Sequence, residues 1–325
     1  MVKKAVALNA KFMTEVKPKA PFNFDATVHK PSHFPAPIEH YLESIYWQTM
    51  RFGSKVLGLK MENQGTIDNP VIRLTFFSEL PLTKKETDAI INEIQWRFDL
   101  DSDLSEFSNR FKHDDLLNPV LQKWRGMHVS CGNSLYELLV ISILLQNATV
   151  RRTVQMMKAL LDKYGTRVRF DGKELYAFWE PERLHRTPEQ ELRELKVGYR
   201  AKYFKKTSED FVNGVVDEFK LRQMSMEEAK KELDKLYGVG PASASILLFE
   251  ALHHYDTIEK IGPWEQKIYS HLLFNKELIP AETILQEIHK RYGKWKTLAM
   301  HYIFEDLFWK RKTQKVEWLE KLIRL

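Results

Sequence analysis

A short glycine-flanked turn, Gly238-Val239-Gly240, separates two amphipathic stretches and is followed directly by Pro241. Proline suits the first position of a helix, because its missing N–H would have no partner there. Backbone N–H groups beside a helix N-terminus form an anion site that suits a phosphate. Main-chain donors of this kind hold a nucleic-acid backbone without reading its sequence. The same turn is also compatible with an ordinary helical hairpin whose glycines only reverse the chain.

A second group of candidate residues lies upstream, where basic and aromatic side chains alternate: Tyr199, Arg200, Lys202 and Tyr203. We predict that Arg200 and Lys202 contact DNA phosphates, because such contacts supply most sequence-independent affinity. The alternative is a solvated helix face whose aromatic rings pack inward. Further along, His253 and His254 are adjacent without a supporting carboxylate pattern, so we expect them at the surface and expect no catalytic metal.

Helices with recognisable start signals must position these residues. Ser225 opens the helix that leads into the turn, with an apolar face formed by Met226, Ala229, Leu233 and Leu236. Upstream, Ser134 and Glu137 have the spacing of a capping box. They open an apolar helix that runs through Leu145 to a polar break at residues 146–149.

The remaining helices follow from weaker signals. One is expected to run to about Tyr164 and to end at Gly165, in the C′ position typical of glycine. Thr187 with Gln190 is expected to cap a short helix. Further helices are expected at about 241–253, 264–273, 280–291 and 294–309, before a basic tail with Lys310, Arg311, Lys312 and Lys315.

The N-terminal part has a different texture. Residues 1–20 contain five lysines and little pattern, which indicates a loose basic arm. Residues 21–110 are expected to form an α+β domain, with strands near 22–28, 55–59 and 71–77 and a helix over 83–98. Residues 111–325 are expected to be helical, with the hairpin unit at 225–253. The predicted fold class is mainly α with an N-terminal α+β domain.

Composition limits the function without deciding it. The chain has 325 residues, a net charge of +6 and a pI near 9.0, which modestly favours polyanionic partners. Its single cysteine, Cys131, excludes a disulfide framework and a four-cysteine iron–sulfur cluster within one chain. No stretch reaches membrane-spanning length, and the apolar part of residues 1–9 is too short for a secretory signal. We therefore expect no membrane contact and an intracellular location.

Four segments occur in the order seen in one known superfamily. Residues 233–248 around the turn, the apolar helix and polar break at 138–149, residues 195–203 and residues 295–304 are similar to motifs of the helix-hairpin-helix DNA glycosylases. That superfamily contains endonuclease III, 8-oxoguanine glycosylase and the 3-methyladenine glycosylases. Residues 21–100 also resemble the extra N-terminal domain of the last two branches.

The resemblance implies a catalytic carboxylate at the start of the helix that follows the hairpin. Glu265 occupies this position when Pro263 is matched to the proline of the alkylpurine branch. The family uses aspartate, and glutamate would move the charge by roughly 1.3–1.5 Å unless the backbone compensates. Asp256 is a nearby alternative that follows the hairpin too early. Glu265 could otherwise be a first-turn glutamate that only favours the helix dipole.

The resemblance also bears on strand cleavage. Bifunctional members use a lysine two residues beyond the second hairpin glycine, where this chain has Ala242. Lys267 lies on the following helix but not at the matching place. We therefore predict a monofunctional enzyme, with lyase activity from another lysine as the alternative. No cofactor is expected, although the hairpin carbonyls could hold a monovalent cation, as the family resemblance implies.

A damaged base must leave the duplex before its glycosidic bond can be reached. The resemblance places the side chain that fills the gap at the polar break, where Asn147 and its neighbour Gln146 are candidates; the alternative is that they only end a helix. The flipped base should stack on aromatic rings. The candidates, drawn from 39 aromatic residues of which most must be core, are Trp264, Phe304, Tyr136, Tyr269 and Trp309.

The leading hypothesis is a monofunctional DNA glycosylase of base excision repair that hydrolyses the N-glycosidic bond of an alkylated or deaminated purine. Its expected partner is double-stranded DNA with a damaged base, and we expect a monomer. The alternatives are an 8-oxoguanine-type glycosylase, a non-catalytic lesion-binding protein that lost the family aspartate, and a helical adaptor with a coincidental hairpin.

Overall fold

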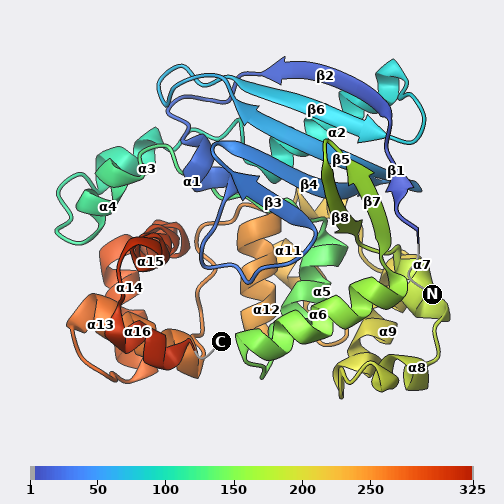
Figure 1. Ribbon diagram of the computed structural model, residues 1–325. Coiled ribbons are helices and arrows are strands. Elements are labelled where there is room, and N and C mark those ends of the chain that lie inside the picture. The colour runs from blue at the N-terminus through green and yellow to red at the C-terminus, as the bar shows by residue number, and fades with distance from the viewer. Residues whose placement is uncertain (1–3, 324–325) are drawn as a thin grey trace.

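A computed structural model describes residues 4–323, and Figure 1 shows its two layers. A five-stranded antiparallel sheet lies above a body of helices. The strands follow the order β2-β6-β5-β4-β3. Their bounds are β2 (Ala10–Val16), β3 (Glu39–Leu42), β4 (Ile45–Phe52), β5 (Lys55–Asn63) and β6 (Ile72–Ser78).

The sheet packs one face on α2 (Lys84–Arg97), which begins at a capping box formed by Thr83 and Glu86. Alternate residues of β5 and β6 point into this core, among them Leu59, Leu74 and Phe76. The predicted strands near 55–59 and 71–77 and the predicted helix over 83–98 are therefore confirmed.

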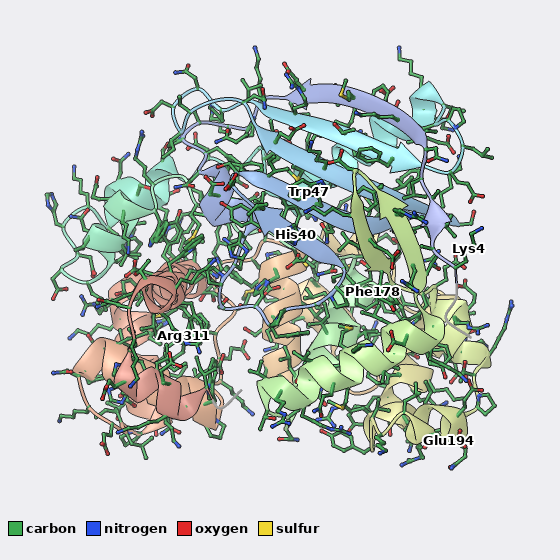
Figure 2. The ribbon with its side chains drawn as sticks, viewed as in Figure 1. Lys4, His40, Trp47, Phe178, Glu194 and Arg311 are labelled. Atoms are coloured by element: carbon green, nitrogen blue, oxygen red, sulfur yellow. The ribbon has the colours of Figure 1, made fainter. Side chains whose placement is uncertain are left out.

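A second, three-stranded sheet joins the N-terminus to the helical body. It has the order β1-β7-β8, where β1 (Val6–Ala7) pairs in parallel with β7 (Thr166–Phe170), and β8 (Lys173–Ala177) pairs with β7. Trp47 of β4 donates to the Asp171 carboxylate in the β7–β8 turn at 2.7 Å. In Figure 2, Trp47 and Phe178 mark the zone where the sheets meet the helices.

Three expectations from the sequence are wrong. The expected basic arm at 1–20 is not loose over Ala10–Val16, because this segment pairs along its whole length with β6. The expected strand near 22–28 is instead helix α1 (Phe24–Val28), since Asn23 caps it by accepting from the Ala26 amide. Residues 111–325 are not all helical, because they contribute β7 and β8 to the second sheet. The sequence also does not predict β3 and β4.

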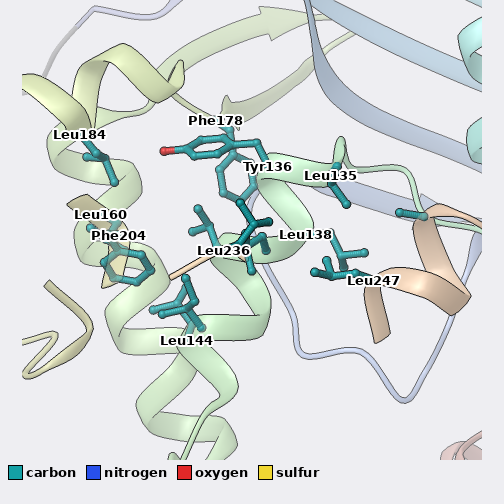
Figure 3. Packing of buried hydrophobic residues seen from close by; sticks show 14 of the residues in the cluster. Leu135, Tyr136, Leu138, Leu144, Leu160, Phe178, Leu184, Phe204, Leu236 and Leu247 are labelled. Carbon is teal, nitrogen blue, oxygen red and sulfur yellow. The ribbon is translucent and has the colours of Figure 1, made fainter. Parts of the chain in front are cut away.

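The helical body has two cores. The first surrounds α5 (Leu135–Leu145) and α6 (Val150–Tyr164), with α9 (Arg200–Val212) beside them. Figure 3 shows its tightly packed leucine and aromatic side chains. The second surrounds α13 (Pro263–Phe274), α14 (Ala281–Tyr292) and α15 (Lys296–Thr313). The orange and red ribbons in Figure 1 trace this second group.

The remaining helices connect or cover these cores. They are α3 (Ser105–Arg110), α4 (Leu117–Lys123), α7 (Pro181–Arg186), α8 (Glu189–Glu194), α10 (Glu218–Leu221), α11 (Met226–Leu233), α12 (Pro241–Ile246), the π-helix η1 (Leu247–Ala251), the 3₁₀ turn η2 (Gly293–Trp295) and α16 (Glu317–Leu322). Within residues 4–323, no helix is both long and apolar enough to cross a bilayer.

The predicted capping box at Ser134 is confirmed, and so is the predicted helix start at Ser225. Gly165 does end α6, but its φ of −65° is not left-handed. A Cβ there would lie 2.6 Å from the Leu161 carbonyl oxygen, so close approach explains the glycine. The expectation that Thr187 opens a helix is wrong: Pro188 is the N-cap of α8, whereas Thr187 is the C-cap of α7 and its hydroxyl donates to the Arg183 carbonyl.

The expected basic tail is wrong in part. Lys310, Arg311 and Lys312 lie in the last turns of α15, and α16 follows them. Arg311 pairs with Glu320 of α16 at 2.6 Å, which folds α16 back against α15.

Candidate active site and nucleic-acid interface

The turn between α11 and α12 requires a glycine at its first position. Gly238 has a φ of +87°, and a Cβ there would lie 2.8 Å from the Tyr203 ring. Gly240 is the N-cap of α12 with an extended backbone, and its carbonyl accepts from the Ala244 amide. The Val239 amide donates to Leu236, so it is used within the turn. The amides of the first turn of α12 are therefore the donors left for an anion.

Gln146 braces this turn rather than standing free. Its side-chain amide donates to the Gly238 carbonyl at 3.0 Å and lies 3.4 Å from the Ser243 hydroxyl. The polar break after α5 is thereby held against the hairpin. Gln146 is a positioning residue of the hairpin in this structure.

Asn147 lies at the exposed tip of the break. Its backbone has a φ of +48°, and its side chain donates to the Tyr199 hydroxyl at 3.3 Å. The left-handed backbone at Asn147 turns the chain away from the axis of α5, so its side chain does not continue the helix. This location suits a side chain that enters a duplex. The sequence does not reveal that Tyr199 accepts a hydrogen bond from Asn147.

Arg200 is buried rather than displayed at the surface. Its side chain is only 7% exposed, and it donates to the Ile143 carbonyl at 3.1 Å and to the Gln146 carbonyl. Both carbonyls lie at the C-terminal end of α5, and the Ile143 carbonyl also accepts from the Gln146 amide. The expected phosphate contact by Arg200 is therefore wrong, because the guanidinium caps a helix end.

Lys202 is exposed and lies on the hairpin side of α9. Its ammonium is 5.3 Å from the Tyr237 ring centroid, and a hydrogen bond to Tyr237 raises the pKa of Lys202. Tyr199, Tyr203 and Tyr237 form a ladder with centroid spacings of 5.4 and 5.3 Å. Lys202 therefore remains available to a phosphate next to the hairpin.

Glu265 is the third residue of α13, which begins with Pro263. One of its carboxylate oxygens accepts from the Gly262 amide at 2.8 Å, as in a capping box. Burial raises the pKa of Glu265, and the Gly262 hydrogen bond opposes that rise. A half-buried carboxylate with a raised pKa is typical of a functional site, although helix capping also accounts for the hydrogen bond.

Three predicted pocket aromatics lie close to one another near this end of α13, and Tyr269 is four residues after Glu265 on the same helix face. The ring of Phe304 on α15 lies 5.9 Å from that of Trp264 and 6.5 Å from that of Tyr269. Burial, followed by the charge of Glu265, raises the pKa of the Tyr269 hydroxyl well above its usual value. Trp264 is 37% exposed, so its ring is accessible to a base. The fold thus brings Glu265, Trp264, Tyr269 and Phe304 together.

Two other aromatic candidates lie elsewhere. Tyr136 is buried in the α5 core, where its hydroxyl bonds to Ser208 at 2.8 Å and accepts from the Trp179 indole (Figure 3). Trp309 stacks on Trp124 at 5.2 Å, further along α15. The assignment of Tyr136 to the base pocket is wrong, because its polar end is satisfied inside a different core.

Other expected groups also have structural partners. Asp256 pairs with Lys296, so it is not a free carboxylate near the site. His253 is not at the surface, since its ring stacks on Trp96 at 4.7 Å. Among residues 4–323, no cluster of three His, Cys, Asp or Glu side chains has the arrangement needed for a metal ion.

Comparison with known proteins places these features in a family context. Residues 140–314 match the family described as HhH-GPD superfamily base excision DNA repair protein. A DNA-3-methyladenine glycosylase of Bacillus subtilis is 26% identical over 247 residues, which cover 74% of this chain and 80% of that protein. A probable N-glycosylase/DNA lyase of Methanothermobacter thermautotrophicus is 23% identical over 231 residues, which cover 65% and 73%.

Two solved structures share the fold. The 3-methyladenine DNA-glycosylase from Archaeoglobus fulgidus has a TM-score of 0.73 at 16% identity, covering 93% of this chain and 99% of that one. The 8-oxoguanine glycosylase/lyase of Clostridium acetobutylicum, solved with double-stranded DNA, has a TM-score of 0.67 at 20% identity, covering 93% and 98%. The predicted fold class is confirmed.

Proposed function

This chain belongs to the HhH-GPD superfamily of base excision DNA repair proteins and is a DNA N-glycosylase, and from that premise we propose that it is monofunctional and releases an alkylated or deaminated purine through Glu265. It would act inside the cell, as a monomer, on duplex DNA that contains one damaged base. The observation that carries the proposal is the meeting of Glu265 with Trp264, Tyr269 and Phe304 at the start of α13.

In this mechanism the hairpin and Lys202 hold the DNA backbone, and Asn147 enters the space that the flipped nucleotide leaves. The base stacks against Trp264 and Phe304, whose ring faces attract a cationic purine. The N-glycosidic bond then breaks and its electron pair leaves with the base. Glu265, when ionised, stabilises the positive charge that develops on the sugar and orients the water that attacks it.

Ala242 supports the monofunctional assignment. It occupies the place at which bifunctional relatives of this family carry a nucleophilic lysine, and a methyl group forms no Schiff base. The product would be an abasic site on an intact strand. The name of the Bacillus subtilis relative supports an alkylated purine as the substrate.

A second candidate function is non-catalytic lesion binding. The bond between Glu265 and the Gly262 amide favours it, because a capping glutamate is useful to the helix without any chemistry. In that case the protein would hold damaged DNA and release nothing.

The test uses duplexes that each contain one 3-methyladenine, 7-methylguanine, hypoxanthine or 8-oxoguanine. We expect strand scission only after alkali treatment, and a loss of about a hundredfold to a thousandfold in single-turnover rate for Glu265→Gln. Scission without alkali would contradict the monofunctional assignment. Unchanged release by Glu265→Gln would remove Glu265 from the mechanism, and duplex binding without release of any base would establish the second candidate.

A further inference from the structure

A cluster of polar and ionisable side chains lies near Phe304 and takes no part in the mechanism above. It is drawn from the loop after α1, from the π-helix η1 and from α15. Its members are the buried Lys30 and Glu305, the half-buried Ser32, Glu250 and His301, and the exposed His33. Lys30 is 6% exposed and Glu305 only 1% exposed. Buried charges are costly unless they have partners, so a cluster of this kind requires an explanation.

The hydrogen bonds of the cluster leave polar atoms over. The Lys30 ammonium donates to the Ala26 carbonyl at 2.8 Å and to the His128 carbonyl at 3.1 Å. The Ser32 hydroxyl donates to one carboxylate oxygen of Glu305. Among the atoms of residues 4–323, the second Glu305 oxygen and Nε2 of His301 are buried and have no hydrogen-bond partner. These two atoms therefore have hydrogen-bonding capacity that the described residues do not use.

The cluster borders the place proposed for the flipped base. His301 lies three residues before Phe304 and four residues before Glu305 on α15, so its side chain can border both. Glu305 itself points about 100° away from Phe304 around the helix. The Phe249 ring meets the His301 ring edge-on at 5.2 Å, which brings η1 against the same side of α15.

The helix that leaves the hairpin points to the same place. Ala242, Ile246 and Glu250 follow one another at intervals of four residues and form the incompletely buried face of α12 and η1. Ala242 is exposed near the hairpin, whereas Glu250 is half-buried next to the cluster. A π-helix within a helical run is frequent at functional sites.

Both carboxyl groups of the cluster ionise at a higher pH than usual, because burial raises the pKa of Glu305 as well as that of Glu250; Lys30 and Ser32 oppose the rise at Glu305. Burial, followed by the charge of Glu305, raises the pKa of Glu250 to about 7, and Lys30 opposes that rise. Burial lowers the pKa of Lys30 to about 8. Burial also lowers the pKa of His301 well below its usual range, so this ring is neutral. Two carboxyl groups therefore face a single ammonium group.

We propose that Glu250 and Glu305 form the inner end of the base site and select purines that carry a positive charge and amino donors over neutral purines. This proposal rests on the proposed function, because it assumes a base stacked on Phe304. A cationic alkylpurine would be attracted to the carboxylates, and its amino group could donate to the free Glu305 oxygen. A neutral purine that presents a carbonyl there would leave both acceptors without donors.

The test measures binding rather than excision. Duplexes with 2′-fluoro-7-methyldeoxyguanosine or 2′-fluoro-deoxyinosine resist glycosidic cleavage, because the fluorine disfavours positive charge on the sugar. We expect wild type to prefer the cationic duplex and Glu250→Gln to reduce that preference about tenfold. Glu305→Gln should act in the same direction. Glu39→Gln is the matched control, since burial raises the pKa of Glu39 in the N-terminal sheet, where its carboxylate bonds to Tyr46.

The outcomes separate this proposal from the proposed function. If Glu250→Gln removes the preference but the wild type releases no base, the glycosylase mechanism is contradicted and the base-site assignment stands. A wild-type protein without preference, or a preference unchanged in Glu250→Gln, would overturn the assignment even if bases are released. Because Glu250 is half-buried whereas Glu305 is almost fully buried, the Glu250 variant decides the matter should Glu305→Gln fail to fold.

Discussion

At the start of α13, two influences act on Glu265 in opposite directions. Burial favours its neutral form and raises its pKa, whereas the Gly262 amide favours the carboxylate. Stabilising a positive sugar requires the ionised form. The raised pKa therefore makes the activity sensitive to mild acid, while the amide limits this sensitivity.

The first prediction concerns the pH dependence of base release. The active form is the carboxylate and its pKa is raised above the usual 4.5, so the single-turnover rate should fall at a higher pH than for an ordinary glutamate. Glu265→Asp should shift this acid limb to lower pH, because aspartate is the stronger acid. The shorter side chain should also lower the plateau by up to about a hundredfold. The pH profile of Glu250→Gln, measured in parallel, shows which glutamate controls the fall in rate at acid pH. If this fall moves in Glu250→Gln and not in Glu265→Asp, it does not report the ionisation of Glu265.

The second prediction compares Arg200, which is buried against two backbone carbonyls, with Lys202, which is exposed two residues further along α9. Arg200→Ala removes a buried guanidinium from two carbonyls and should lower the free energy of unfolding by about 2–3 kcal/mol. Lys202→Ala should leave stability unchanged and should reduce the slope of log affinity for duplex against log salt concentration by about 1. Denaturant titration and DNA binding at several salt concentrations distinguish them. The reverse pattern would restore Arg200 as a phosphate contact.

At the scale of the element, the end of α5 and the hairpin act as one unit. Gln146 bonds to the hairpin carbonyl at Gly238, and Arg200 bonds to the carbonyl of Gln146. The break that presents Asn147 is thus held by residues that were predicted to touch DNA themselves. The sequence pattern located the right segments but could not tell which side chain faces outward.

The third prediction tests the two hairpin glycines against each other. Gly238→Ala places a Cβ in a left-handed backbone and 2.8 Å from the Tyr203 ring. We expect a loss of about 1–2 kcal/mol in stability and weaker binding to all duplexes. Gly240→Ala meets no atom within 4 Å and should cost less. Equal effects of the two substitutions, measured by thermal unfolding and by affinity for undamaged duplex, would argue against this account of the turn.

Local signals in the sequence account for the elements that were predicted correctly. A serine followed three residues later by glutamate located the start of α5, because a capping box involves neighbouring residues only. In contrast, β4 is covered on both faces and is buried almost throughout, so it lacks the alternation that identifies a strand. Strand β1 pairs with β7, more than 150 residues away, and no local pattern predicts such a contact.

The same distinction applies to the site. The resemblance to the family predicted Glu265, Trp264 and Phe304 as site residues. In the fold, the rings of Trp264 and Phe304 meet at the start of α13, where Glu265 lies. Glu250 and Glu305 were missed, because a single glutamate within an apolar stretch looks like an ordinary surface position. Their proximity depends on how η1 packs on α15, and this is decided by tertiary structure.

At the scale of the molecule, a buried ion network joins the N-terminal layer to the helical body. Glu93 of α2 binds Arg222, next to α10, at 2.7 Å and Arg97 at 2.7 Å. Arg222 also pairs with Glu218 at 2.5 Å and stacks on Trp96 at 5.0 Å. The N-terminal layer, which lies far from α13 in Figure 1, is thus tied to the helical body at α10.

The last prediction concerns the stability of this joint. Burial alone would raise the pKa of Glu93, but Arg222 and Arg97 outweigh burial and lower it to about 2, against 4.5 for a free glutamate. A carboxylate whose pKa is lower in the folded state stabilises the fold above pH 4.5, and this contribution is lost as the pH falls from 4.5 towards 2. The shift corresponds to about 3 kcal/mol at neutral pH as an order of magnitude.

Glu93→Gln should therefore lower the free energy of unfolding at pH 7 and flatten its decline in acid, as measured by denaturant titration between pH 7 and pH 3. Glu194→Gln is the control, since Glu194 is exposed at the edge of the helical body (Figure 2). Parallel pH profiles for wild type and Glu93→Gln would show that the network does not hold the layers together. Lys30 follows the N-terminal helix α1, whereas Glu305 lies on α15. If the layers separate in Glu93→Gln, these two residues should therefore separate as well. Selection between cationic and neutral purines should then decline along with stability.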